Sequence, residues 1–250
     1  MSRYFIKLSY DGAAYCGWQR QPNGIAVQQK VEEALATILR IPVPIVGAGR
    51  TDAGVHARMM TAHFDASLTA DGLDSLSDRL NGLLPADIAV GGIVPVRPEA
   101  HARFSATGRT YYYYVSLAKS PFDRNYACRL PGAVDFDAMN DAAAVLPSCS
   151  DFTSFSKLHT DVRTNNCRIS SAAWTSQGQG IWQFSITADR FLRNMVRAIV
   201  GTLLIVGRGK LDADGFRTII EARNRSLAGT SAPAHGLFLA DISYPEDIFL

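Results

Sequence analysis

The chain has 250 residues, of which 47% are hydrophobic and 19% are charged. This composition is that of a globular protein and excludes an intrinsically disordered chain. The formal net charge is only +2, so charge alone does not indicate a nucleic-acid partner. The longest apolar stretch, 198–207, is too short to span a bilayer, and the N-terminus lacks a signal-peptide pattern, so we expect a cytoplasmic protein without a membrane segment.

The first half of the chain predicts an alternation of strands and helices. Residues 4–10 alternate in polarity and predict a strand. Apolar residues recur at helical spacing over 27–39, and prolines follow, so this segment predicts an amphipathic helix. The remaining patterns predict short strands at 45–46 and 58–64, a helix over 73–83 and a strand over 88–96.

The second half predicts a similar series of elements. Four consecutive tyrosines within 110–117 favour a strand. If the largely apolar segment 191–206 is helical, Arg190, Arg193 and Arg197 share one face, which is either a phosphate-binding surface or a solvated one. The other patterns predict helices at 136–146 and 212–222, and strands at 168–175, 181–187 and 237–243.

This order of elements predicts an α+β protein. We expect two ferredoxin-like lobes, formed by residues 1–104 and 105–250, with mainly antiparallel sheets. No low-complexity linker separates the halves, so the lobes should share an interface. A central cleft between them is the expected place for a functional site.

The four cysteines and five histidines form neither a disulfide pattern nor a metal-binding pattern. No CxxC pair is present, and no two histidines have a zinc-site spacing such as HExxH. We therefore expect reduced thiols and no bound metal.

The most informative segment is the glycine-rich turn 48–57, which follows a short apolar strand. It presents one carboxylate, Asp52, with a guanidinium two residues earlier and an imidazole four residues later. We expect Gly49 and Gly54 to permit a close approach of backbone and substrate that a Cβ would prevent. A loop on a rigid scaffold commonly carries a reactive group, although Asp and Gly are also ordinary turn residues.

This turn is one of six segments that occur in a characteristic order and spacing. They are Tyr10-Asp11-Gly12, Gly17–Gln21, Gly49–His56, His101–Thr107, Asp151–Phe155 and Phe191–Arg197. With these segments the chain resembles the tRNA pseudouridine synthase A family over nearly its whole length.

The resemblance implies an enzyme that isomerises uridine to pseudouridine in the anticodon stem-loop of tRNA, usually at positions 38 to 40. It implies that Asp52 is the catalytic aspartate, that Tyr111 packs on the target base and that Arg197 pairs with the aspartate. It also implies that no cofactor is used, and that a homodimer binds tRNA across both subunits. The cleft between the lobes would then be the RNA-binding site.

Such an isomerisation requires an anion and access to the base. A carboxylate is a competent nucleophile. Three routes stay open for Asp52: addition to C6 of uracil, capture of C1′ of the ribose, and removal of a sugar proton to give a glycal. A stacked uridine must first be extruded from the stem, for which Arg50, His56 and Arg58 are candidate substrate-binding residues. Tyr111 would give the loosened base a flat surface, a contact worth about 1–3 kcal/mol.

Several of these residues also have structural interpretations. His56 fits a buried structural histidine equally well, and Arg197 fits a surface arginine on a basic helix. Residues 112–114 are expected to pack within a sheet. Trp18 and Phe155 fit core packing at least as well as they fit the lining of a site.

Two other functions stay open. A non-catalytic RNA-binding module of ferredoxin-like lobes would stack bases on sheet aromatics without a buried carboxylate. A nucleoside hydrolase or glycosidase would use two carboxylates around the bond that it cleaves, and only one is found in a motif. The carboxylate of Asp52 favours the synthase over the binding module, since a lone acid in an RNA cleft repels phosphate.

Overall fold

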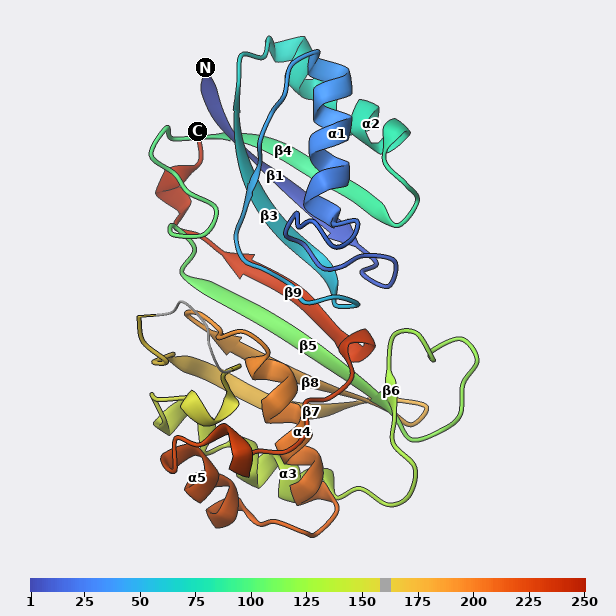
Figure 1. Cartoon of the computed structure of the whole chain (residues 1–250), viewed down its shortest axis with the longest axis vertical. Helices are drawn as coiled ribbons and strands as arrows, with labels where there is room; N and C mark the ends of the chain where they lie inside the picture. The colour runs from blue at the N-terminus through green and yellow to red at the C-terminus, as the bar shows by residue number, and fades with distance from the viewer. Residues whose placement is uncertain (158–162) are drawn as a thin grey trace. The chain divides into compact units, whose positions relative to one another are not determined.

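The structure is a computed structural model that describes residues 1–157 and 163–250 (Figure 1). Its contacts divide the chain into two compact units. Unit 1 consists of Met1–Thr107 and Phe238–Leu250, and unit 2 consists of Gly108–Leu237. The first boundary lies close to the expected one at residue 104. The C-terminal segment, expected in the second lobe, packs instead with unit 1.

Unit 1 is built on strands that are mostly antiparallel. β1 lies between β3 and β4 and is antiparallel to both, β2 pairs with β3, and β9 runs parallel to β3. Because β1 is central, Phe5 and Ile6 are fully buried although their side chains point to opposite faces. The strands are β1 (Ser2–Tyr10), β2 (Val46–Gly47), β3 (His56–Ala66), β4 (Ile88–Val96) and β9 (Leu237–Ser243).

Two helices, α1 (Val27–Leu39) and α2 (Ala70–Leu83), lie beside each other against the strands of unit 1 (Figure 1). The apolar stripe of α1 is buried, as its helical spacing predicts. At the start of α2 the Thr69 hydroxyl accepts a hydrogen bond from the backbone N–H of Gly72 at 3.1 Å. This contact satisfies one of the N–H groups that a helix start leaves unpaired.

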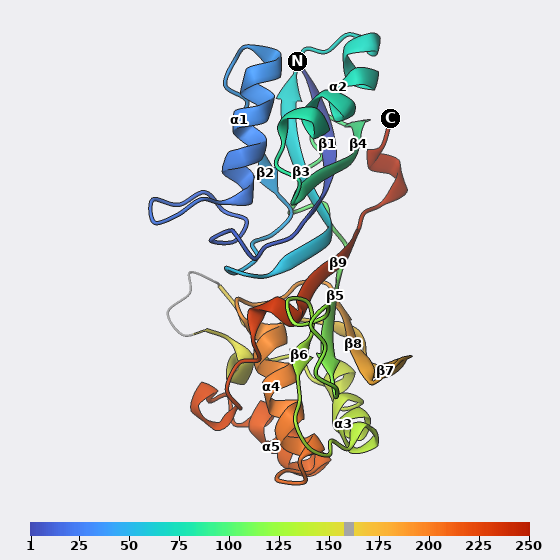
Figure 2. The same cartoon turned by 90° about the vertical axis from the view of Figure 1, so that its right-hand side faces the viewer.

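Unit 2 combines a small antiparallel group of strands with three helices. β8 lies between β5 and β7, and the short β6 runs parallel to β5. Figure 2 shows α3, α4 and α5 grouped together, with α4 beside the strands and α3 and α5 toward the lower end of the picture. The elements are β5 (Gly108–Ser116), β6 (Cys128–Arg129), β7 (Ile169–Gly178), β8 (Ile181–Ala188), α3 (Phe136–Ala143), α4 (Met195–Gly207) and α5 (Ala213–Glu221).

The core of unit 2 is formed by aromatic side chains and by α4. The Phe136 ring stacks on Trp182, with centroids 3.9 Å apart, and Phe155 is fully buried against Phe216. Phe155 is therefore a core residue. Among the described residues, no helix has the length and apolarity needed to cross a membrane. Short 3-10 helices complete the chain: η1 (Leu146–Ser148), η2 (Thr153–Phe155), η3 (Arg225–Leu227), η4 (Ala234–Gly236) and η5 (Glu246–Ile248).

The predicted bounds of α1, β4 and β9 are confirmed, but the predicted helix over 191–206 begins too early. α4 starts only at Met195, because Asn194 at its N-cap adopts a left-handed backbone with φ of 65°. Arg190 and Arg193 therefore precede the helix, and the predicted shared face with Arg197 is wrong. The predicted helix over 136–146 ends at Ala143, after which the chain continues into η1.

A buried histidine of β3 should make unit 1 sensitive to acid. The Nδ1 atom of His63 accepts a hydrogen bond from the Ala102 N–H at 3.1 Å, and its ring lies edge-on to His101. Burial, with smaller contributions from His101 and Arg3, lowers the pKa of His63 to about 4. The folded state therefore holds this imidazole neutral, whereas the unfolded chain takes up a proton below about pH 6.5.

We expect stability to be lost as the pH falls from about 6.5 towards 4, because the unfolded state then binds a proton that the folded state does not. The measurement is the unfolding temperature of wild type and of His63→Asn at about pH 7.5 and about pH 5. The advantage of the wild type should shrink at the lower pH. Parallel pH profiles for the two proteins would contradict this prediction.

Candidate functional site

Asp52 lies in the loop between β2 and β3, and the backbone on both sides of it is fixed. The Ala48 N–H donates to the Thr61 carbonyl at 2.8 Å, and the Val55 N–H donates back to the Asp52 carbonyl at 3.1 Å. Asp52 is half-buried at the tip of this turn. The sequence thus folds here into a tight loop that holds one carboxylate at the end of a strand.

Two aromatic residues hold the residue just before Asp52. The Tyr10 hydroxyl shares a buried hydrogen bond of 2.8 Å with the Thr51 hydroxyl. The backbone N–H of Trp18 donates to the Thr51 carbonyl at 3.3 Å. The Trp18 side chain is 1% exposed and stacks on Tyr10, so it belongs to the core and does not line an open site. Thr51 is therefore held through both its side chain and its backbone.

Close backbone packing in this region depends on Gly12 and Gly17, neither of which the sequence singled out for this role. A Cβ at Gly12 would overlap the carbonyl oxygen of Val55, and one at Gly17 would overlap that of Thr51. By contrast, a Cβ at Gly49 would meet no protein atom within 4 Å, and the expected close approach of Gly49 to the substrate stays a prediction. Gly54 has a φ of 75°, a left-handed conformation that favours glycine.

His56 is a buried residue that ties the Asp52 loop to the end of β1. It is 1% exposed, and its ring stacks on Phe238 with centroids 4.5 Å apart. The backbone N–H of Gly12 donates a hydrogen bond to the His56 Nδ1 atom at 3.1 Å when the imidazole is neutral. The same Nδ1 atom lies 2.9 Å from an Asp11 carboxylate oxygen, with which a protonated imidazole would form an ion pair. This environment is that of a structural histidine, one of the two interpretations of His56 that the sequence left open.

Arg50 and Arg58 are both exposed in unit 1. The Arg58 guanidinium lies over the Phe238 ring, 5.6 Å from its centroid. Arg58 also lines an open hollow of about 400 Å³ that Asp52 does not line. The residues around this hollow are Ser9, Tyr10, Asp11, Ala57, Arg58, Ala86, Asp87, Ala89 and Phe238.

Tyr111 lies in the middle of β5 in unit 2, opposite Ile186 of β8. Its half-buried ring meets Phe191 edge-on, with centroids 5.1 Å apart. Because side chains alternate along a strand, Tyr111 and Tyr113 share one face of β5. Tyr113 is fully buried, as expected for sheet packing, and burial raises the pKa of its hydroxyl.

Arg197 lies in the first turn of α4 and reaches the face of β5 that carries Tyr113. Its Nε donates to the Ala232 carbonyl at 2.7 Å, and the Tyr113 hydroxyl donates to the next carbonyl, that of Pro233, at 2.9 Å. Unit 2 therefore brings Arg197 and Tyr111 to one side of its strands. Asp52, with Arg50, His56 and Arg58, belongs to unit 1.

Comparison with known proteins decides the family. A family model described as tRNA pseudouridine synthase matches residues 7–105 and 149–245. The chain belongs to the tRNA pseudouridine synthase family. Asp52 and Arg197 fall within the matched segments of this pseudouridine synthase, and Tyr111 falls between them.

Relatives are similar to this synthase over the full chain. The tRNA pseudouridine synthase A of Parabacteroides distasonis is 64% identical, with 100% of this chain and 98% of the relative covered. That of Porphyromonas gingivalis is 58% identical, with both chains covered completely. That of Shouchella clausii is 41% identical, with 100% of this chain and 96% of the relative covered.

Family membership identifies the chain as an isomerase that modifies uridine in tRNA. It sets aside the non-catalytic RNA-binding module and the nucleoside hydrolase. The contacts of Tyr10, Thr51 and Gln28 that support the Asp52 loop were not predicted from the sequence. Only Gln28 carries a local signal, because it is a polar residue on the apolar stripe of α1.

Proposed function

We propose that this enzyme converts uridine to pseudouridine in the anticodon stem-loop of tRNA, at positions 38 to 40, without a cofactor and with Asp52 as the nucleophile. The observation that supports this most is the placement of Asp52. Its carboxylate is half-buried on a loop that Tyr10 and Trp18 hold at the adjacent residue, Thr51. Such fixation suits a nucleophile, because catalysis depends on a preset geometry.

The reaction rearranges bonds within one nucleotide. The N1–C1′ bond breaks, the uracil turns, and a C5–C1′ bond forms; the proton on C5 leaves and N1 gains one. No atom is gained or lost, so no redox partner or group donor is needed. A carboxylate anion can begin this rearrangement at C6, at C1′ or at a sugar proton.

The other site residues receive roles that follow from their surroundings. We assign stacking on the uracil to Tyr111, since its ring is half-buried and already edge-packed on Phe191. Arg197 pairs with the Asp52 carboxylate and orients it. Arg50 and Arg58 are exposed and contact the RNA while the uridine is extruded. His56 supports substrate binding from within, by fixing the end of the Asp52 loop.

The proposed reaction requires side chains from both units at one substrate. They act as ferredoxin-like lobes that flank an RNA-binding cleft, with the Asp52 loop on one side and Tyr111 and Arg197 on the other. We further propose that the enzyme is a cytoplasmic homodimer whose two subunits both contact the bound tRNA.

The test is to incubate the protein with unmodified tRNA and to map every pseudouridine. The expected result is new pseudouridine at positions 38 to 40, with no added cofactor. Tight binding without any modification would overturn the proposal in favour of a binding module. Release of free uracil would overturn it in favour of a hydrolase.

A substitution at Tyr111 tests the stacking role. Tyr111→Phe keeps the aromatic face, so tRNA affinity should stay within about twofold of wild type. Tyr111→Ala removes the stack and should lower kcat/KM by about 5- to 150-fold, which corresponds to about 1–3 kcal/mol. The measurements are tRNA-binding titrations and single-turnover rates. A large loss of affinity in Tyr111→Phe would count against stacking and in favour of a role for the hydroxyl in binding.

A further inference from the structure

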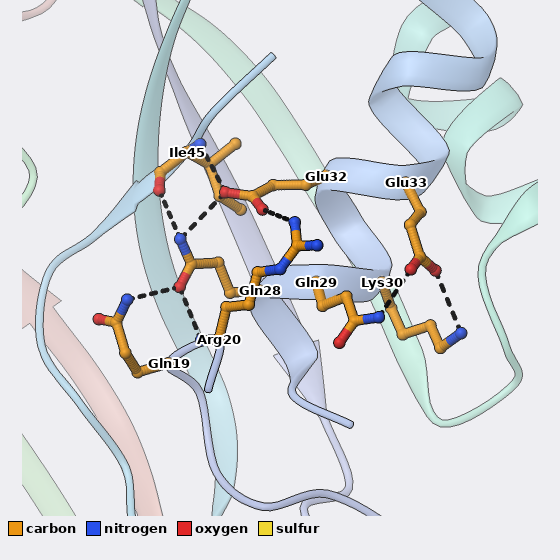
Figure 3. Close-up of polar contacts among 8 residues, drawn as sticks. All are labelled: Gln19, Arg20, Gln28, Gln29, Lys30, Glu32, Glu33 and Ile45. Atoms are coloured by element: carbon orange, nitrogen blue, oxygen red, sulfur yellow. Dashed lines mark hydrogen bonds and ion pairs between the residues drawn. The ribbon is translucent and has the colours of Figure 1, made fainter. Parts of the chain in front are cut away.

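A buried side-chain amide of α1 makes four hydrogen bonds that link three segments (Figure 3). The Oε1 atom of Gln28 accepts from the Gln19 Nε2 at 2.9 Å and from the Arg20 backbone N–H at 3.0 Å. Its Nε2 donates to Glu32 Oε1 and to the Ile45 carbonyl, both at 3.0 Å. Gln28 is 9% exposed, and these bonds use every donor and acceptor position of its amide.

The first of the linked segments, 16–21, packs directly on the loop of Asp52. The backbone N–H of Trp18 donates to the Thr51 carbonyl, and Gly17 approaches the same carbonyl so closely that a Cβ there would overlap it. The Gln28 backbone also takes part, since its N–H donates to the Trp18 carbonyl at 3.0 Å. A shift of segment 16–21 would therefore move Thr51, which precedes Asp52.

The second linked segment leads into the same loop from the other side. Gln28 Nε2 binds the carbonyl of Ile45, and the Ile45 N–H donates to Glu32 Oε1 at 3.2 Å. Ile45 is followed by β2 and then by the Asp52 loop. Farther along, Gly47 lies against the Trp18 indole, where a Cβ would overlap the ring. One amide thus fixes both the entry of the loop and the segment that packs against its tip.

We infer that Gln28 is a positioning residue, which sets the placement of the Asp52 carboxylate through Trp18 and Ile45 without contacting the substrate. This inference rests on the proposed nucleophilic role of Asp52. Without the Gln28 amide, its buried hydrogen-bond partners would lose a bond each, and segment 16–21 and the Asp52 loop could shift. Even a small displacement of a reacting group lowers the rate of reaction strongly. The binding of tRNA depends less on this placement than the rate does, because Arg58, which we also assign to RNA contact, lies on β3 outside the loop.

The experiment compares Gln28→Met with Gln29→Met. Methionine is an unbranched side chain of about the same length as glutamine and slightly larger volume, and it makes none of the four bonds. Gln29 is the neighbouring residue on α1, and its amide binds only Glu33, at 2.8 Å, among the bonds drawn in Figure 3. Gln28→Met should lower kcat by between about 10- and 100-fold, with the Kd for tRNA unchanged within about twofold. Gln29→Met should match wild type in both quantities.

A second readout follows the loop itself. Amide hydrogen exchange over 49–55 should become faster in Gln28→Met and stay unchanged in Gln29→Met, because the Val55 N–H is bonded within the loop. If Gln28→Met does not fold, Gln28→Glu replaces it. Glutamate retains the two bonds accepted from Gln19 and Arg20 but loses both donated bonds, to Glu32 and to Ile45, and places a second carboxylate beside Glu32. The kcat should therefore still fall by at least about 10-fold, with a smaller effect on Kd.

Wild-type kcat in a folded Gln28 variant would overturn the inference. The inference would also be overturned if the variant lost activity only in proportion to its unfolded fraction and had wild-type activity well below its unfolding temperature. Gln28 would then contribute to stability alone. The proposed function fails separately: a wild-type protein that forms no pseudouridine in tRNA would overturn it, and this inference with it.

Discussion

Asp52→Asn should abolish pseudouridine formation while leaving tRNA binding intact. The amide keeps the shape of the side chain but removes the anion that all three routes require. The rate should fall by on the order of 10⁴-fold or more, the scale seen when a nucleophile is removed from a covalent mechanism. The loss should appear in the single-turnover rate constant, measured with saturating enzyme. The affinity for tRNA should be equal or slightly higher, since one negative charge near phosphate is gone.

The matched control is Asp71→Asn. Asp71 is an exposed carboxylate in the first turn of α2 of the same unit, so its replacement changes the net charge by the same amount. It should leave the rate and affinity within about twofold of wild type, because an exposed surface substitution has little effect on stability. Near-normal turnover by Asp52→Asn would rule out Asp52 as the nucleophile. A matching loss of tRNA affinity would instead identify Asp52 as a binding residue.

Gly12→Ala should damage both the stability of unit 1 and the reaction. The added Cβ would overlap the Val55 carbonyl oxygen, and that atom belongs to the backbone, so the turn after Asp52 must move. Overpacking of this kind costs about 1–3 kcal/mol. For a domain of about 150–250 residues each kcal/mol lowers the unfolding temperature by about 2–4 °C. We expect a lower unfolding temperature and, well below it, a reduced kcat.

Gly49→Ala provides the control for stability. Gly49 lies in the same loop, but a Cβ there meets no atom within 4 Å and its φ is not left-handed. Its unfolding temperature should therefore stay close to that of wild type. Because Gly49 adjoins Arg50, this variant is not a control for activity. Equal stability and equal kcat for Gly12→Ala and wild type would show that the close approach to Val55 does not hold the loop.

The Asp52 loop is held in place mainly by residues that lie outside it. Thr51 is held by Tyr10 of β1 and by Trp18, both of which precede it by more than thirty residues in the sequence. The scaffold therefore fixes the backbone, and the loop carries small side chains together with one guanidinium, that of Arg50, and one carboxylate, that of Asp52. Gln28 extends this support to α1.

Local patterns in the sequence determined most elements of the fold. The apolar residues of α1 recur every three or four positions, and the bounds predicted from them are confirmed. The start of α4 was missed because it depends on the backbone conformation of a single residue, Asn194, which leaves no trace in the periodicity. The motif around Asp52 also stood out locally, because glycines and one charged residue of each sign occur within a few positions.

Only the tertiary structure decided which segments meet. The sequence predicted β9 as a strand and assigned it to the second lobe, whereas the contacts of the chain from Phe238 onward group it with unit 1, where it pairs with β3 at His56 and Ala57. It likewise offered His56 as a substrate ligand or as a core residue, and packing against Phe238 and Gly12 buries it. The physical reason is the same in both cases. Backbone periodicity is a local property, but the choice of a hydrogen-bond partner and the burial of a side chain depend on residues far away in the chain.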